Sequence, residues 1–232
     1  MKKIAIMTAG GDCAGLNAAI KSVVMAASKN NIVVVGIIDG FIGFVERKYM
    51  VLDNKIVENI ERQGGTILGS SNKECPFHYP SKEKKDEYED RVDDSIKALR
   101  KIGVEAMIII GGDGTLDSAR VIDEAGMPTI GIPKTIDNDM VASNPTIGFD
   151  TGVENAVEAI RKLKTTAASH RRVMVVEMMG RTSGYLTLYS GFAAGADIIL
   201  LPERDYDLNI VCNRVKEIMS TCLLYTSDAA DD

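Results

Sequence analysis

Six short, continuously apolar runs recur along the 232-residue chain, and longer segments of helical periodicity separate most of them. The runs are rich in isoleucine and valine and do not alternate with polar residues, which is typical of strands buried on both faces of a parallel sheet. They occupy residues 3–8, 32–38, 106–110, 128–132, 173–178 and 197–202. This alternation of strands and helices predicts a doubly wound α/β fold with mostly parallel sheets.

Two segments carry clear helical patterns. Residues 16–30 place apolar side chains on one stripe of a helix. Thr151 and Glu154 have the spacing of a capping box, and a second apolar stripe follows them. The polar segment 70–91 contains two prolines and many charges, so we expect an exposed loop that leads into a helix near residues 86–101.

The composition argues against several classes of function. A net charge of −6 is unfavourable for general binding to nucleic acid or to an anionic membrane, although a small phosphorylated ligand needs only a few local cations. The four cysteines form no paired motif, so neither a zinc site nor a disulfide framework is expected. Since the sequence shows neither a signal peptide nor an apolar stretch of membrane-spanning length, we expect a cytoplasmic protein.

Glycines cluster where the predicted strands end. Gly10 and Gly11 follow the first strand, and Gly111, Gly112 and Gly114 follow the strand at 106–110. In open α/β sheets ligands lie at the carboxyl ends of the strands, and a glycine turn before a helix offers free N–H groups to phosphate oxygens. Neither turn matches a Walker loop or a dinucleotide-binding motif, and a simple turn is the commoner alternative for each one alone.

Carboxylates and cations accompany these glycines. Asp113 lies between glycines, where it could hold Mg²⁺ on donor phosphates. Asp137 and Asp139 follow the run at 128–132, and Lys134 and Arg181 supply positive charge. Phosphoryl transfer to an alcohol requires a base, a metal ion and cations, so together these residues suit that reaction, whereas "PKTIDND" alone would read as a polar turn.

Six motifs together resemble the phosphofructokinase family across residues 3–203: "GGDCAGLNAAI", "GGTILGS", "IGGDGT", "PKTIDND", "TIGFDTG" and "EMMGRTSG". The resemblance implies transfer of the γ-phosphate of ATP to the 1-hydroxyl of fructose 6-phosphate in glycolysis, with Mg²⁺. It also implies a two-lobed α/β protein that forms a homo-oligomer, a tetramer or a dimer. Nucleic acid and membranes are not expected as partners.

The resemblance assigns roles residue by residue. The donor-binding residues that it implies are Gly11, Lys73, Gly112, Asp113, Gly114 and Thr115, with Asp113 on the metal ion. The acceptor-binding residues that it implies are Lys134, Thr135, Ile136, Asp137, Arg172, Met179, Gly180 and Arg181. Asp137 is implied as the general base, Asp139 as a supporting carboxylate, and Arg181 as the cation that stabilises the transferring group.

Three positions bear on the choice of donor. Asn72 stands where many ATP-using relatives carry arginine, and Lys73 could take over that contact. Lys134 is typical of pyrophosphate users, whereas Gly114 is typical of ATP users because an aspartate there would repel the α-phosphate of a nucleotide. We expect ATP, with a pyrophosphate-dependent enzyme as one alternative and a catalytically silent nucleotide- or sugar-phosphate-binding paralogue as another.

Three segments are expected along the chain. Residues 1–142 are predicted to form the donor lobe, and residues 143–221 an incomplete sugar-phosphate lobe. The last residues, "CLLYTSDAADD" (222–232), fit no family pattern and resemble a translated sequencing adaptor, with a natural acidic tail as the competing reading. On the first reading the chain is a fragment that stops near Thr221.

Overall fold

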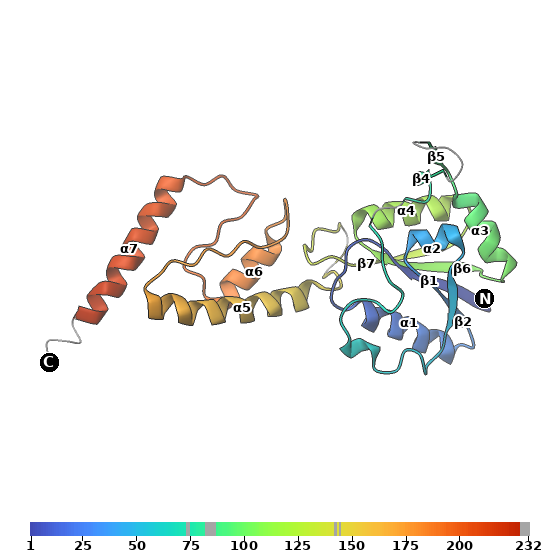
Figure 1. Cartoon of the computed structure of the whole chain (residues 1–232), viewed down its shortest axis with the longest axis horizontal. Helices are drawn as coiled ribbons and strands as arrows, with labels where there is room; N and C mark the ends of the chain where they lie inside the picture. Colours follow the sequence, from blue (N-terminus) through green and yellow to red (C-terminus); the bar gives the residue numbers. More distant parts are fainter. Residues whose placement is uncertain (73–74, 82–86, 142, 144, 228–232) are drawn as a thin grey trace. The chain divides into compact units, whose positions relative to one another are not determined.

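The computed structural model describes residues 1–72, 75–81, 87–141, 143 and 145–227, the last seven by their backbone alone. The chain divides into two compact units (Figure 1). The first comprises residues 1–136 and 140–148, and the second comprises residues 137–139 together with the chain from 149 onward.

A five-stranded sheet forms the centre of the first unit, with strand order β3-β2-β1-β6-β7. Its strands are β1 (Lys3–Thr8), β2 (Val33–Ile37), β3 (Tyr49–Leu52), β6 (Ala106–Gly111) and β7 (Thr129–Pro133). β1, β2, β6 and β7 are mutually parallel, and only the edge strand β3 runs antiparallel to its neighbour. The mostly parallel sheet predicted from the apolar runs is confirmed.

Helices cover both faces of this sheet (Figure 1). They are α1 (Leu16–Lys29), α2 (Phe41–Glu46), the 3₁₀ turn η1 (Ile60–Arg62), α3 (Val92–Lys101) and α4 (Asp113–Glu124). α1 and η1 pack on the face that buries Ile4 and Ile6, whereas α2, α3 and α4 pack on the face that buries Ala5 and Met7. Successive side chains of β1 therefore enter opposite cores, because side chains alternate across a strand.

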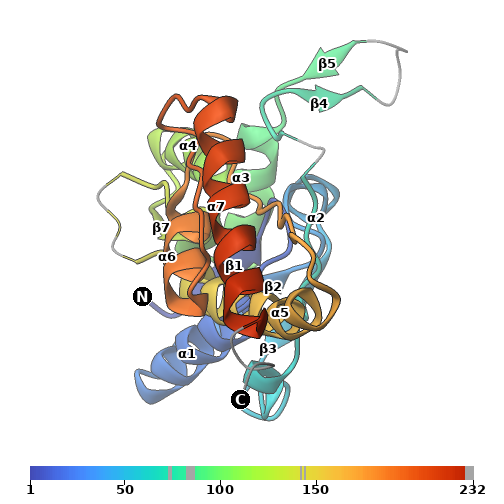
Figure 2. The same cartoon turned by 90° about the vertical axis from the view of Figure 1, so that its left-hand side faces the viewer.

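The segment predicted as an exposed loop contains a small hairpin, β4 (Tyr79–Pro80) paired antiparallel with β5 (Tyr88–Glu89) (Figure 2). The rings of His78 and Tyr88 stack on it with centroids 3.8 Å apart. This stacking of two aromatic side chains holds together a pair of strands of only two residues each, which have few backbone hydrogen bonds of their own.

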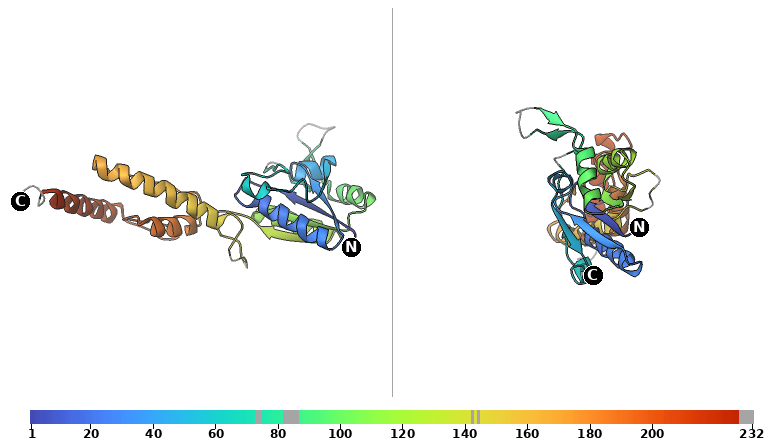
Figure 3. Two further views of the ribbon diagram at one scale, coloured as in Figure 1. Left: turned by 90° about the horizontal axis from the view of Figure 1, so that it is seen from below. Right: turned by 90° about the vertical axis from the view of Figure 1, so that its right-hand side faces the viewer.

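The regular secondary structure in the described part of the second unit is helical. It contains α5 (Phe149–His170), α6 (Tyr185–Ala194) and α7 (Leu208–Ser227). α5 and α6 lie side by side (Figure 3), and the rings of Phe149 and Tyr189 meet edge to face at 5.4 Å. The capping box predicted at Thr151 is wrong, because α5 begins two residues earlier.

The strands predicted at residues 173–178 and 197–202 are also wrong: neither segment is a strand in the described part of the chain. A strand exists only where a neighbour accepts its backbone hydrogen bonds, and neither segment joins a sheet. Val175, in the middle of the first segment, is 93% exposed. Apolar composition alone therefore did not determine secondary structure here. Among the described residues we find no helix with the length and hydropathy needed to span a bilayer.

Candidate functional site

The first candidate loop is the glycine turn between β1 and α1. Gly10 has a φ of 86°, a conformation that favours glycine. Its N–H donates to the Ser71 carbonyl at 3.0 Å, and the Ser70 hydroxyl donates to the Gly10 carbonyl at 2.6 Å. The turn that follows β1 is thus joined on both sides to the segment around residue 70, the second half of the "GGTILGS" motif.

Lys134 lies beneath this turn. Its side chain is buried, with 5% of the residue exposed, and its Nζ donates to the Gly11 carbonyl at 2.8 Å. The Lys134 backbone N–H donates to the Gly111 carbonyl at 2.9 Å, which continues the pairing of β7 with β6. A buried ammonium group must be hydrogen-bonded to be tolerated. Lys134 therefore links the first glycine turn to the second, and its charge lies at the donor loop that the sequence analysis assigned to Gly11.

The second candidate loop opens α4. Gly112 precedes the helix, Asp113 and Gly114 are exposed in its first turn, and Thr115 is buried. The first N–H groups of a helix lack partners within the helix and attract anions. A Cβ at Gly111 would overlap the Thr115 side chain, so glycine is required there for packing.

No packing contact requires glycine at position 11 or at position 114. A Cβ built on either one would meet no other heavy atom of the described chain within 4 Å. Both therefore border open space, which is what a loop that must admit a ligand close to its backbone requires.

A pocket of about 350 Å³ lies over the first loop. It is lined by Gly10, Gly11, Asp12, Gly65, Thr66, Ser70 and Asn72. Gly10, Gly11 and Asn72 were singled out from the sequence, whereas Asp12, Gly65, Thr66 and Ser70 were given no role. Gly65, Thr66 and Ser70 lie in the "GGTILGS" motif, which could have pointed to them. The expected donor contact of Lys73 lies outside the described residues.

The donor set suits a magnesium-bound polyphosphate. Asp113 offers one exposed carboxylate beside the N–H groups of α4. No cluster of three His, Cys, Asp or Glu side chains that could hold a metal ion occurs in the described part of the chain. Mg²⁺ is typically held by one or two carboxylates, water and substrate phosphates rather than by an all-protein cage. The residues present therefore fit a metal ion that arrives with its phosphates.

Thr135 and Ile136 continue β7 toward the second unit. The Thr135 N–H donates to the Ile147 carbonyl at 3.2 Å, and the Thr146 hydroxyl donates to the Thr135 carbonyl at 2.7 Å. The Ile136 side chain packs against the core beneath α1. These contacts fix the point at which the chain leaves the sheet.

In the second unit, the residues after β7 meet a loop that follows them by more than 40 residues. The Ser183 hydroxyl donates to the Asp137 carbonyl oxygen at 2.7 Å, which joins Asp137 to the loop that carries Gly180 and Arg181. Gly180 has a φ of 148°, and a Cβ there would collide with the Ser183 carbonyl, so this turn requires glycine. Asp139 is exposed.

A second pocket, of about 200 Å³, lies within this unit and includes Met179, Gly180 and Arg181 among its lining residues. Met179 is 73% exposed. Arg181 is exposed and has a φ of 51°, in the left-handed region. Arg172 follows the end of α5, is exposed, and does not line either pocket. The structure thus brings Asp137 and Arg181 into one neighbourhood and leaves Arg172 outside the pocket.

Comparison with known proteins defines the class. A family model described as phosphofructokinase matches residues 3–230. The ATP-dependent 6-phosphofructokinase 2 of Clostridium perfringens is 47% identical over 94% of this chain and 60% of its own length. The ATP-dependent 6-phosphofructokinase 2 of Streptomyces coelicolor is 46% identical over 94% of this chain and 61% of its own.

A solved structure agrees with these matches. Phosphofructokinase from Saccharomyces cerevisiae superimposes with a TM-score of 0.82 at 29% identity, covering 98% of this chain and 32% of the other. The chain belongs to the phosphofructokinase family. It spans about 60% of the length of the curated relatives reported above.

Proposed function

We propose that this chain belongs to an ATP-dependent 6-phosphofructokinase of glycolysis, which converts fructose 6-phosphate into fructose 1,6-bisphosphate. The observation that carries the proposal is the open space at Gly114, in the first turn of α4. The relatives named above are ATP-dependent enzymes, which supports the same donor.

The donor lobe of the proposal is residues 1–142. The N–H groups of the Gly11 turn and of the first turn of α4 bind the donor phosphates. Asp113 holds Mg²⁺, which when bound neutralises phosphate charge and orients the γ-phosphate. Lys134 keeps the Gly11 turn in place through its 2.8 Å hydrogen bond and adds a positive charge beneath it.

The acceptor lobe of the proposal is residues 143–221, and the acceptor site also uses the "TIDND" residues (135–139) near the end of the donor lobe. The Asp137 carboxylate accepts the proton of the 1-hydroxyl as that oxygen forms its bond to the γ-phosphorus, and the bond from this phosphorus to the β-phosphate oxygen breaks to release ADP. Arg181 stabilises charge on the transferring group, with Asp139 as a neighbouring carboxylate. Arg172 belongs to the proposed sugar-phosphate contacts, and the protein acts in the cytoplasm as a homo-oligomer.

A pyrophosphate-dependent enzyme is the second candidate, because Lys134 adds a positive charge that a small polyphosphate donor could use. The residue at position 114 distinguishes the ATP-dependent enzyme from the pyrophosphate-dependent one. An aspartate at this position would place a negative charge in the space that the α-phosphate of ATP requires, whereas pyrophosphate has no third phosphate to repel.

The test compares kcat/KM for ATP and for pyrophosphate in a protein of full family length that carries these residues. The wild type is expected to prefer ATP, and Gly114→Asp to lose ATP-dependent activity selectively. Gly114→Ala is the matched control, since it adds a Cβ without charge where the chain leaves room. A wild-type preference for pyrophosphate would overturn the donor assignment, and inactivity with both donors would favour a silent paralogue.

A further inference from the structure

One wall of the donor pocket is held by the side chain of Asn17, which lies in the "GGDCAGLNAAI" motif but has no role in the resemblance or in the proposed mechanism. Gly65 and Thr66, which line the pocket, lie in the stretch from Gln63 to Ile67. Asn17, the second residue of α1, bridges the two ends of this stretch. Its Nδ2 donates to the Gln63 carbonyl at 3.1 Å, and its Oδ1 accepts from the Ile67 N–H at 2.8 Å.

The geometry fixes the orientation of the amide. A backbone carbonyl only accepts and a backbone N–H only donates, so the side-chain nitrogen must face Gln63 and the oxygen must face Ile67. Asn17 is 2% exposed, and buried polar atoms of this kind are costly when they lose their partners. The bridge is therefore a specific one that only a side chain with both a donor and an acceptor can make.

A second anchor holds the far side of the same wall. The Thr66 hydroxyl lies 3.0 Å from that of Thr8, at the end of β1, and the Thr8 hydroxyl donates to the Gly69 carbonyl at 2.8 Å. The Thr66 hydroxyl also accepts from the Leu68 N–H at 3.2 Å. Thr8 thus fixes Thr66 against the sheet, while Asn17 fixes the chain on both sides of Gly64–Thr66.

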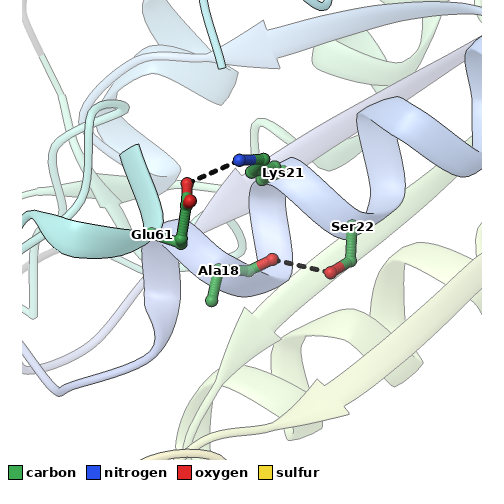
Figure 4. A network of polar contacts seen from close by, with 4 residues as sticks. All are labelled: Ala18, Lys21, Ser22 and Glu61. Carbon is green, nitrogen blue, oxygen red and sulfur yellow. Dashed lines mark hydrogen bonds and ion pairs between the residues drawn. The ribbon is translucent and has the colours of Figure 1, made fainter. Parts of the chain in front are cut away.

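α1 also contacts the segment before this wall through an ion pair between Lys21 and Glu61. Lys21 Nζ donates to Glu61 Oε2 at 2.7 Å, and the Ser22 hydroxyl donates to the Ala18 carbonyl of its own helix at 2.8 Å (Figure 4). The ion pair is partly exposed, so it contributes little to holding the loop. Among the described residues, the Ser22 side chain has no hydrogen bond outside α1, so it offers a matched control on the same helix.

We infer that Asn17 is a positioning residue for the phosphate donor: its side-chain amide bridges Gln63 and Ile67 and so holds the Gly65–Thr66 wall against the Gly10–Gly11 turn. This inference rests on the proposed function, which places the donor in that pocket. Loss of the bridge allows the wall to move and lowers donor affinity, while the acceptor loops of the second unit keep their own contacts.

The experiment measures two properties of the 232-residue chain. Amide hydrogen exchange in peptides that cover residues 60–70 reports the wall, and equilibrium titration with ATP and Mg²⁺ reports the donor site. In Asn17→Ala we expect exchange at Ile67 to increase by about tenfold and the Kd for MgATP to rise by about tenfold, while exchange in β6 stays unchanged. Ser22→Ala should match the wild type in the exchange at Ile67, in the exchange in β6 and in the Kd for MgATP.

Asn17→Asp is the conservative variant. It keeps an acceptor for the Ile67 N–H but loses the donor to Gln63, and a carboxylate near the start of α1 is compatible with the helix. We expect Ile67 to remain protected, residues 63–65 to exchange faster, and the Kd for MgATP to rise by about threefold. This variant also keeps the inference testable if Asn17→Ala does not fold.

The outcomes separate the inference from the proposed function. Tight MgATP binding by the wild type with an unchanged Kd in both Asn17 variants would overturn the positioning role alone. Unchanged exchange at Ile67 in Asn17→Ala would do the same. A wild-type chain that does not bind MgATP would overturn the donor assignment, and with it the role of Asn17.

Discussion

Gly111 and Gly114 lie three residues apart in the "GGDG" loop, yet the structure predicts opposite effects on stability when each is replaced by alanine. A Cβ at Gly111 would lie within 3.0 Å of three atoms of the Thr115 side chain, a separation that real Cβ atoms essentially never show. One of these atoms is the Thr115 Cβ itself, so a change of rotamer cannot relieve the overlap. The backbone between β6 and α4 must shift instead.

The expected magnitude follows from this overlap. Overpacking in a filled interior costs about 1–3 kcal/mol, and Thr115 is only 8% exposed. For a protein of this size each kcal/mol corresponds to roughly 2–4 °C in Tm, so Gly111→Ala should lower the Tm of the first unit by about 2–12 °C. Gly114→Ala adds a Cβ in open space within α4, where alanine is favoured over glycine by about 1 kcal/mol.

The assay is thermal unfolding followed by circular dichroism, with amide hydrogen exchange in β1 and β6 to assign the change to the first unit. Gly111→Ala should unfold at a lower temperature and Gly114→Ala at an equal or higher one. MgATP binding should weaken in Gly111→Ala, because the loop is displaced, and should stay close to that of the wild type in Gly114→Ala, whose added Cβ carries no charge and meets open space. An unchanged Tm in Gly111→Ala, or an equal loss in both variants, would refute the reasoning.

Three further predictions concern single side chains. Asp137→Asn should lower kcat by roughly 10²–10⁴-fold with a nearly unchanged KM for fructose 6-phosphate, as steady-state kinetics in a protein of family length would show; unchanged turnover would contradict the base assignment. Asp113→Asn should raise the Mg²⁺ concentration needed for half-maximal ATP binding, measured by titration at fixed ATP. The hydrogen bond from Lys21 lowers the pKa of Glu61 from its usual 4.5. Lys21→Met should therefore lower the Tm slightly at pH values above about 4.5, and the difference from the wild type should vanish as the pH falls through the lowered pKa.

The first unit was predictable because its signals are local. Continuous apolar runs identified four of the five strands of the main sheet. Because β1 and β6 are parallel neighbours, Gly11 and Gly114 both follow the carboxyl ends of adjacent strands. The fifth strand, Tyr49–Leu52, was missed because a run of only four apolar residues between charged neighbours is too short to identify a strand. The same reasoning failed for residues 173–178, where an equally apolar run has no strand to pair with in the described chain.

The sequence by itself determined which residue types stand at the strand ends, because glycine loops and strand order depend on local pattern and parallel topology. Only the tertiary structure decided which side chains meet across long separations: Lys134 with the Gly11 carbonyl, Ser183 with the Asp137 carbonyl, and Asn17 with Gln63 and Ile67. Each of these contacts is a hydrogen bond between a side chain and a backbone group. Backbone N–H and C=O groups are the same in every residue, so the identity of the partner depends on the folded path of the chain and leaves no mark in the amino-acid sequence.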